Sequence, residues 1–192
     1  MKPAIARFYW SRLPVAGRVL DVGCGDGSLA RYKPPKVQIY GIDKNVREAS
    51  HAALYETVCT LDLDAVDQLP YDDEYFDAVV AKDVLEHLQK PWVTVEEIAR
   101  VVRQDGIVMA SVVCERGRRT WNDYSHVRGF TRGAARQLFR DAGLHVEGVW
   151  RMGPVPFAAR LNAISVVPIV LTIPLFDWLY TSSYEIMARR RM

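Results

Sequence analysis

Short apolar runs alternate along this chain with segments of helical periodicity. The runs are rich in valine, isoleucine and leucine, and are typical of buried strands in a parallel sheet. Strands are predicted at residues 18–22, 37–42, 56–61, 76–81, 106–113, 145–150 and 183–189. Helical patterns fall between them, notably at residues 92–103 and at 131–142, which Gly143 closes. The alternation predicts an α/β fold with a doubly wound open sheet, which binds ligands at the carboxyl ends of its strands.

Alternating glycines follow the first predicted strand, in the sequence VLDVGCGDGSLA at residues 19–30. They are Gly23, Gly25 and Gly27. Glycine lets a ligand approach the backbone closely and accepts positive φ angles without steric cost. We expect a helix to begin at Ser28, so that its free amides face the ligand. The turn is typical of a site for a nucleotide-like molecule.

The spacing of the glycines argues against a dinucleotide. A dinucleotide fingerprint reads G-x-G-x-x-G, whereas this turn reads G-x-G-x-G. Asp21 stands just before the turn, where a carboxylate repels a pyrophosphate and attracts a ligand with a cationic amino group. Asp43 ends the second predicted strand, where it can accept hydrogen bonds from both hydroxyls of a ribose and repel the 2′-phosphate of NADP. Asp43 is also placed to cap a helix from Asn45, and the two roles are compatible.

The motif D-V-G-C-G-D-G resembles motif I of the class I S-adenosylmethionine-dependent methyltransferases. Further segments match the same family in order: an acidic residue after the third strand, then L-P-Y-D-D-x-x-F-D-A-V, then D-V-L-E-H-L. The resemblance covers roughly residues 15–150 and departs from the family at Gln104-Asp105-Gly106, where Pro-Gly-Gly is usual. It implies a Rossmann-like, doubly wound sheet of seven strands, mostly parallel with an antiparallel last strand.

The resemblance also implies a cofactor, S-adenosylmethionine, which leaves as S-adenosylhomocysteine. In this family the glycine turn wraps the methionine and ribose portions. Asp62 would hydrogen-bond the adenine amino group with Leu63 packed nearby, although Asp64 is a rival for that role, and Ala81 would lie under the methionine portion. The predicted cofactor-binding residues are Asp21, Gly23, Gly25, Asp43, Lys44, Asp62, Leu63 and Ala81.

Transfer of a methyl group from a sulfonium is an in-line displacement. Positioning and desolvation can supply most of its acceleration, so few catalytic side chains are required. The candidate catalytic residues are His87, Tyr124 and His126. His87 has a structural alternative, which is to orient the loop after the fourth strand. Tyr124 and His126 lie in a loop of aromatic and basic residues. That loop either closes over an acceptor or is a solvated loop whose aromatics pack on the domain.

The segment DVLEHL contains residue types that bind metals. Asp83, Glu86 and His87 resemble the D/E-x-x-E-H pattern of some metal-dependent methyltransferases, with His126 as a fourth ligand. Because E-H-L after the fourth strand is also common in family members that use no metal, we predict no bound metal.

An apolar insertion of about residues 153–182 precedes the last predicted strand. Its uncharged centre, residues 162–176, is short for a membrane span and is interrupted by Pro168 and Pro174. Three interpretations remain open: a hydrophobic lid over the acceptor, a homodimer contact, or a membrane-surface anchor through residues 162–180. A lid would suit a lipid-like, quinone-like or aromatic acceptor.

Length and composition limit the number of domains, the class of partner and the cellular location. The chain has 192 residues, enough for a single domain, and a formal net charge of +2, without the basic face of a nucleic-acid binder. Its three cysteines lack metal-ligand spacing, and its N-terminal segment lacks the apolar core of a secretory signal. We therefore expect a cytoplasmic protein. If the apolar insertion is a membrane anchor, the protein would also be membrane-peripheral.

Three functions are compatible with a glycine-rich turn of this kind. The sequence favours a methyltransferase that moves a methyl group from S-adenosylmethionine to a small or lipid-like acceptor. The alternative is a non-catalytic methyltransferase-like protein that binds the same cofactor as a partner or regulator. A nicotinamide-dependent oxidoreductase is disfavoured by the glycine spacing and by Asp21.

Overall fold

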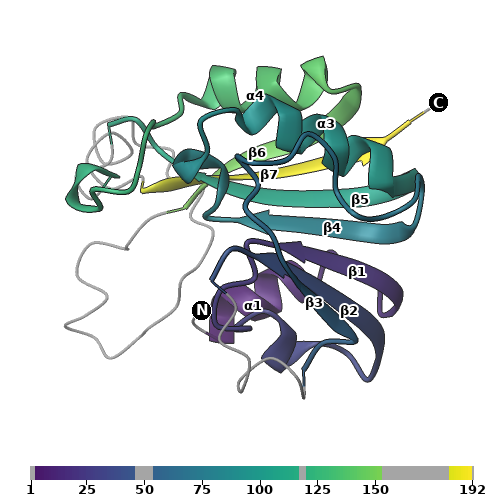
Figure 1. Ribbon diagram of the computed structural model, residues 1–192. Helices are drawn as coiled ribbons and strands as arrows, with labels where there is room; N and C mark the ends of the chain where they lie inside the picture. The colour runs from purple at the N-terminus through teal and green to yellow at the C-terminus, as the bar shows by residue number, and fades with distance from the viewer. Residues whose placement is uncertain (1–2, 46–53, 117–119, 153–181, 192) are drawn as a thin grey trace.

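The computed structural model describes residues 3–45, 54–116, 120–152 and 182–191. These residues form one seven-stranded sheet in the order β3-β2-β1-β4-β5-β7-β6 (Figure 1). The strands are β1 (Ala16–Val22), β2 (Lys36–Asp43), β3 (Thr57–Thr60), β4 (Phe76–Lys82), β5 (Val102–Val113), β6 (Leu144–Met152) and β7 (Ser183–Arg190). The first five strands along the chain pair in parallel, and β7 runs antiparallel to both of its neighbours. The predicted fold class is confirmed.

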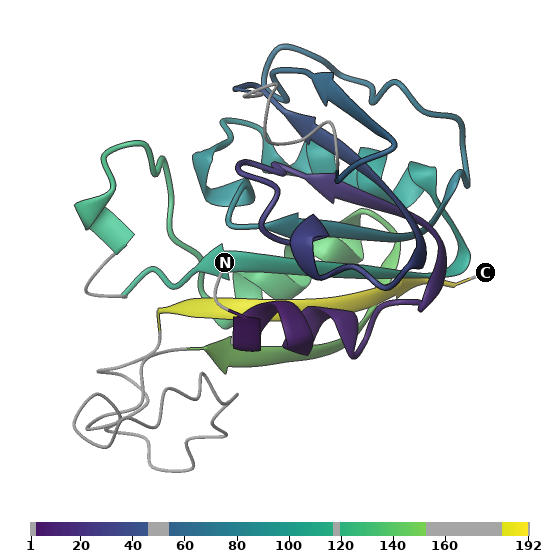
Figure 2. The ribbon, with the colours of Figure 1, turned by 90° about the horizontal axis from the view of Figure 1, so that it is seen from below.

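Helices cover both faces of the sheet. The described helices are α1 (Pro3–Trp10), α3 (Pro91–Val101) and α4 (Arg132–Asp141), with short 3₁₀ turns η1 (Ala30–Tyr32), η2 (Leu85–His87) and η3 (Thr120–Asn122). Figures 1 and 2 show α3 and α4 on one face and α1 on the other. Side chains alternate between the faces of a strand, so Leu20 joins Ile98 and Phe139 in one core, whereas Val19 joins Tyr9 in the other.

The helix α1 is absent from the sequence prediction. A signal for it was present, because Pro3 occupies the first helical position and apolar residues then recur on one side of the segment. Its residues Phe8, Tyr9 and Trp10 are buried. The segment therefore covers one face of the sheet and is part of the folded domain.

The helix predicted from Ser28 is wrong. Only the 3₁₀ turn η1 follows the glycine turn, and the next residue, Lys33, is already extended. Pro34 and Pro35 explain the early stop, because proline has no N–H to donate and disfavours helical geometry in the residue before it. Backbone amides that donate to a ligand here must therefore belong to the glycine turn and not to a helix N-terminus.

The departure at Gln104-Asp105-Gly106 lies inside a strand. β5 starts directly after α3, at Val102, rather than at Gly106 as predicted. Asp105 has φ +58°, and the register between β4 and β5 shifts at this point. The segment is an irregular strand start, far along β5 from the edge where ligands are expected.

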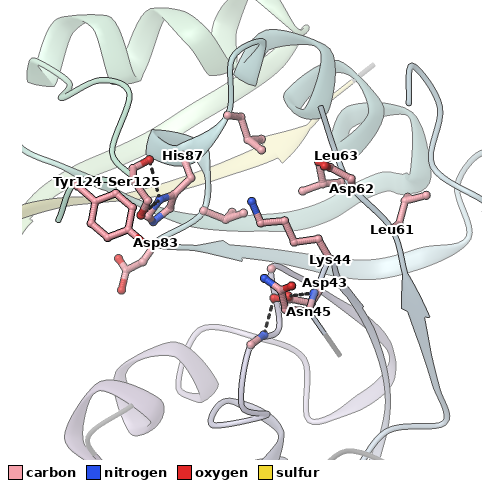
Figure 3. A pocket seen from close by; sticks show the side chains of 14 residues that line it. Asp43, Lys44, Asn45, Leu61, Asp62, Leu63, Asp83, His87, Tyr124 and Ser125 are labelled. Atoms are coloured by element: carbon pink, nitrogen blue, oxygen red, sulfur yellow. Dashed lines mark hydrogen bonds between the residues drawn. The ribbon is translucent and has the colours of Figure 1, made fainter. Parts of the chain in front are cut away.

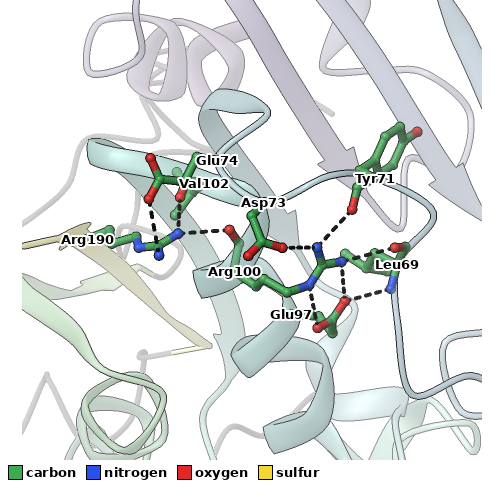
Figure 4. Close-up of polar contacts among 8 residues, drawn as sticks. All are labelled: Leu69, Tyr71, Asp73, Glu74, Glu97, Arg100, Val102 and Arg190. Atoms are coloured by element: carbon green, nitrogen blue, oxygen red, sulfur yellow. Dashed lines mark hydrogen bonds and ion pairs between the residues drawn. The ribbon is translucent and has the colours of Figure 1, made fainter.

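Arg100 fixes the segment L-P-Y-D-D to α3 (Figure 4). Its guanidinium pairs with the carboxylates of Glu97 and Asp73, at 2.7 Å each, and donates to the carbonyls of Leu69 and Tyr71. Glu97 in turn accepts from the Leu69 amide at 2.7 Å. This part of the family resemblance is explained by the connection into β4 rather than by ligand contact.

Arg190, near the end of β7, joins the last strand to α3. It donates to the carbonyls of Arg100 and Val102 at 2.8 and 2.9 Å, and its guanidinium lies 3.4 Å from the Glu74 carboxylate. The final carbonyls of a helix lack partners within the helix, so a cationic donor here stabilises its C-terminus.

Thr131 caps α4, and we expect its loss to be measurable. Its Oγ1 accepts from the Ala134 amide at 2.9 Å. Thr131→Ala removes that acceptor and should lower the free energy of unfolding by about 1 kcal/mol, whereas Thr131→Ser keeps it. Urea unfolding of the three proteins checks this, and equal stability of the alanine variant would contradict the assigned cap.

Two predictions fall outside the described residues. The helix expected from Asn45 falls largely on residues 46–53, and the apolar insertion of about 153–182 lies outside them up to Ser182. The single-domain organisation with that insertion stays a prediction. In the part of the chain that the structure describes, no helix combines the length and apolar character that crossing a membrane requires.

Candidate functional site

A cavity of about 500 Å³ opens at the carboxyl edge of the sheet. It lies beside β1 and β4, where the strand order reverses, which is the usual ligand position in such sheets. Its volume is in the range of small-molecule sites. The lining residues are Gly23, Gly25, Asp43, Lys44, Asn45, Leu61, Asp62, Leu63, Asp83, Val84, His87, Leu88, Tyr124 and Ser125. Figure 3 shows residues 61–63 at one end and His87, Tyr124 and Ser125 at the other, with Lys44 between.

The glycine turn forms one wall of the cavity. The amides of Gly23 and Cys24 donate to the Ile42 carbonyl at 2.7 and 2.9 Å, which ties the turn to β2. Gly25 has φ +51°, and a side chain built on it would meet only the Gly23 carbonyl oxygen, at 4.0 Å. The space beside Gly25 is therefore open to a ligand, as the sequence motif implies.

Asp43 joins the end of β2 to the glycine turn. Its Oδ2 accepts from the Gly25 amide and its Oδ1 from the Asn45 amide, both at 2.8 Å. A carboxylate has about four acceptor positions, so both oxygens keep capacity for ligand hydroxyls. The bond to Asn45 agrees with the capping alternative, and the position on the cavity wall agrees with the ribose role.

Asp62 and Asp64 take different positions. Asp62 and Leu63 line the cavity, whereas Asp64 is absent from its lining. The Asp64 carboxylate accepts from the amides of Gln89 and Lys90, at 2.8 and 3.4 Å, just before α3 begins. The geometry therefore favours Asp62 over its rival for contact with a ligand.

Asp21 and Ala81 lie behind the cavity wall rather than on it. Ala81 is fully buried and opposite Val22 in the sheet. Asp21 is 4% exposed and accepts from the Tyr55 hydroxyl at 2.7 Å. Burial raises the pKa of Asp21 to about 7, against the opposing effects of that hydrogen bond and of Lys82. Sequence reasoning missed Tyr55, because no pattern links it to Asp21.

The raised pKa of Asp21 predicts a pH dependence. The folded protein holds this proton up to about pH 7, whereas the unfolded chain releases it near pH 4. Since the folded state binds more protons across that window, this group makes stability fall as pH rises through it.

We therefore expect Asp21→Asn to flatten the decline in the free energy of unfolding between about pH 4 and about pH 7. Urea unfolding across that range measures it, with Asp72→Asn on the exposed surface as control. An Asp21→Asn profile parallel to that of the wild type would contradict a raised pKa.

The acceptor end of the cavity brings the predicted catalytic residues together. His87 and Tyr124 line it, and Tyr124 is fully exposed to solvent. His126 lies behind His87, with ring centroids 4.6 Å apart. Ser125, which the sequence did not single out, lies with its Oγ 3.0 Å from Nδ1 of His87. The loop after β5 thus approaches the loop after β4.

The acidic residues of DVLEHL diverge. Asp83, with φ +52°, pairs with the Lys82 ammonium and accepts a hydrogen bond from the Ser111 hydroxyl. Glu86 points into the protein, is fully buried, and has a pKa raised to about 7 by burial. Asp83 and Glu86 therefore do not form one ligand set.

Comparison with known proteins agrees with this geometry. A family model described as a methyltransferase domain matches residues 20–110. The chain is 32% identical over 105 residues to an uncharacterized methyltransferase of Schizosaccharomyces pombe, covering 47% of this chain and 38% of that one. It is 32% identical over 120 residues to a ubiquinone biosynthesis O-methyltransferase of Thiobacillus denitrificans, covering 59% of this chain and 52% of that one. The chain thus spans about half or less of these relatives.

A solved structure supports the fold over a longer stretch. A SAM-dependent methyltransferase from Archaeoglobus fulgidus superposes with a TM-score of 0.75 at 16% identity, covering 97% of this chain and 91% of that one. The matched family region starts in β1 and ends in β5, and so holds the glycine turn, Asp43 and Asp62. Over residues 20–110 this chain is therefore similar to a methyltransferase domain, and it shares its fold with the SAM-dependent methyltransferase from Archaeoglobus fulgidus.

Proposed function

We propose that this protein is an enzyme that transfers a methyl group from S-adenosylmethionine to a small or lipid-like acceptor. The observation that carries the proposal is the cavity, which joins the glycine turn and Asp43 to an opposite end lined by His87 and Tyr124. One part suits a nucleoside and the other offers polar groups to a second substrate.

The cofactor end accounts for five of the predicted residues directly. Gly23 and Gly25 leave the backbone accessible, and Asp43 would accept hydrogen bonds from both ribose hydroxyls. Asp62 and Leu63 would hold the adenine. Lys44 also borders the cavity, whereas Asp21 and Ala81 would act by shaping its floor.

The reaction requires little acid–base chemistry. When bound, S-adenosylmethionine supplies an activated methyl group on a sulfonium. The protein would align the acceptor, exclude water and, for a hydroxyl acceptor, remove its proton. His87 is the candidate base, because Ser125 contacts its Nδ1 and the ring lies on the cavity wall. Tyr124 and His126 would position the acceptor and the loop.

A relative of this chain indicates which class of acceptor to test first. The Thiobacillus denitrificans relative is named for ubiquinone biosynthesis and O-methylation, which makes a phenolic hydroxyl the first class to test. The roles of the apolar insertion as lid, as homodimer contact or as a membrane-peripheral segment, and a cytoplasmic location, remain proposals beside this one.

The test is transfer of a labelled methyl group to a panel of phenols, amines, carboxylates and quinone precursors presented in vesicles. A methylated product with stoichiometric S-adenosylhomocysteine supports the enzyme. Tight cofactor binding without transfer to any class on the panel would instead support the non-catalytic partner or regulator. Binding of NAD in preference to S-adenosylmethionine would overturn both.

A further inference from the structure

Three ligand-type side chains converge behind the acceptor end of the cavity. Glu86, His87 and His126 each offer one donor atom, and these atoms all lie within 4.8 Å of one another. Glu86 and His87 belong to η2, after β4, and His126 follows η3, after β5. The amide of Val127 donates to the Glu86 carbonyl at 3.0 Å, which holds the two loops together.

Both histidines are oriented in the manner of metal ligands. Nδ1 of His126 lies 2.5 Å from the Thr120 carbonyl oxygen, and Nδ1 of His87 lies 3.2 Å from that of Ser125. A carbonyl only accepts, so each neutral ring carries its proton on Nδ1 and keeps a lone pair on Nε2. A backbone carbonyl on the second nitrogen is a common way to fix a metal-binding histidine.

The burial of Glu86 indicates a bound cation independently of the two histidines. It is fully buried, and neither carboxylate oxygen has a hydrogen-bond partner of normal geometry among the described residues. The amides of Glu86 itself and of Val113 lie near enough to favour the charged form without forming such bonds. A buried carboxylate that forms no hydrogen bond of normal geometry costs free energy, which a bound cation offsets.

We propose that Glu86, His87 and His126 bind a divalent transition-metal ion such as zinc. Two imidazoles and one carboxylate form a typical three-ligand zinc set that leaves a coordination position for another molecule. Magnesium, which prefers oxygen ligands, is disfavoured by the two nitrogens. Asp83 is left out because Lys82 and Ser111 occupy its carboxylate. The sequence alone predicts no metal, because the E-H-L segment is also common in family members that use none.

The role of the ion, but not its binding, rests on the proposed methyltransferase function. His87 lines the cavity, so an ion held by its Nε2 lies at the acceptor end, and the ion then replaces His87 as the group that activates the acceptor. A hydroxyl that binds a divalent cation loses its proton to water more readily, and its oxygen becomes the better nucleophile. The site therefore favours acceptors that are methylated on oxygen.

The test is metal binding by the full chain after treatment with a chelator and desalting. Titration calorimetry with zinc chloride, and zinc content after a second desalting, should give one ion per chain, with magnesium failing to compete. Glu86→Gln and His126→Ala should each weaken zinc binding at least about tenfold. His145→Ala, an exposed histidine on β6, is the matched control and should bind as the wild type does.

Circular dichroism checks that each variant is folded, and His87→Ala replaces any variant that is not. The proposal is overturned if the wild type binds no zinc, or if folded variants of the three residues bind it as tightly as the control. Thermal shift with S-adenosylmethionine separates the two proposals. A chain that takes the cofactor but no zinc refutes only this site, and a chain that takes zinc but no cofactor refutes only the proposed function.

Discussion

We expect the Asp43→Ala variant to bind S-adenosylmethionine about 100-fold more weakly than the wild-type chain. Hydrogen bonds from two ribose hydroxyls to one carboxylate are charge-assisted, and the variant loses both. The Gly25 amide, which donates to Asp43 at 2.8 Å, also loses its acceptor, so the glycine turn is held less firmly. Both effects act in the same direction. Titration calorimetry measures the change.

Matched variants separate the ribose contact from the support of the turn. Asp43→Asn keeps one acceptor oxygen and should lose about tenfold in affinity. Asp72→Asn, on the exposed surface, should bind as the wild type does. Unchanged affinity of Asp43→Ala would mean that the cofactor lies elsewhere or that its ribose does not contact this residue.

We expect Gly23→Ala to lower the free energy of unfolding by roughly 2–4 kcal/mol and to weaken cofactor binding. Gly23 has φ +71°, a region that residues with a side chain seldom adopt. A Cβ at this position would lie 2.7 Å from Cγ2 and 2.8 Å from Cβ of Val84, which follows β4. The added methyl group is therefore both strained and in steric conflict.

Two further variants resolve those contributions. Gly23→Ala in a Val84→Gly background, which lacks both contacted atoms, should show only the part due to backbone strain. Gly133→Ala, in α4, is the control, because its nearest neighbour, Oγ1 of Thr131, would be 3.8 Å away and helical alanine is favoured over glycine by up to about 1 kcal/mol. Urea unfolding gives all values, and wild-type stability of Gly23→Ala would contradict the described turn.

Much of the fold follows from local pattern. The strands around Val22, Ile42 and Ala81 are continuous apolar runs, because a parallel sheet is buried on both faces, and such runs are easy to find. The helix predicted from Ser28 does not form because Pro34 and Pro35 end any helix within two turns of the glycine motif. The helix α1 is harder to predict, because its eight residues span little more than two turns and give only a short periodic pattern.

The cofactor end of the site was largely predictable. In a parallel sheet the carboxyl ends of neighbouring strands share one edge, so Gly25, Asp43 and Asp62 had to be close once the strands were known. The choice between Asp62 and Asp64 could not be predicted from the sequence, because it depends on which carboxylate accepts from the amides that precede α3.

The acceptor end needed the tertiary structure. His87 and His126 are far apart in sequence, and only the approach of two loops places their rings 4.6 Å apart. The buried state of Glu86 depends on packing after β4 that no sequence spacing expresses. Tyr55 and Ser125 are known as neighbours of site residues only from the described geometry.

The central claim is that the cavity between the glycine turn and the loop after β3 holds the adenosyl portion of the cofactor. A crystal structure of the chain with S-adenosylhomocysteine tests it most directly. We expect both ribose hydroxyls within hydrogen-bond distance of the Asp43 carboxylate, about 3 Å, and the adenine beside Asp62 and Leu63. The product bound outside this cavity, or within it with the ribose turned away from Asp43, would contradict the claim.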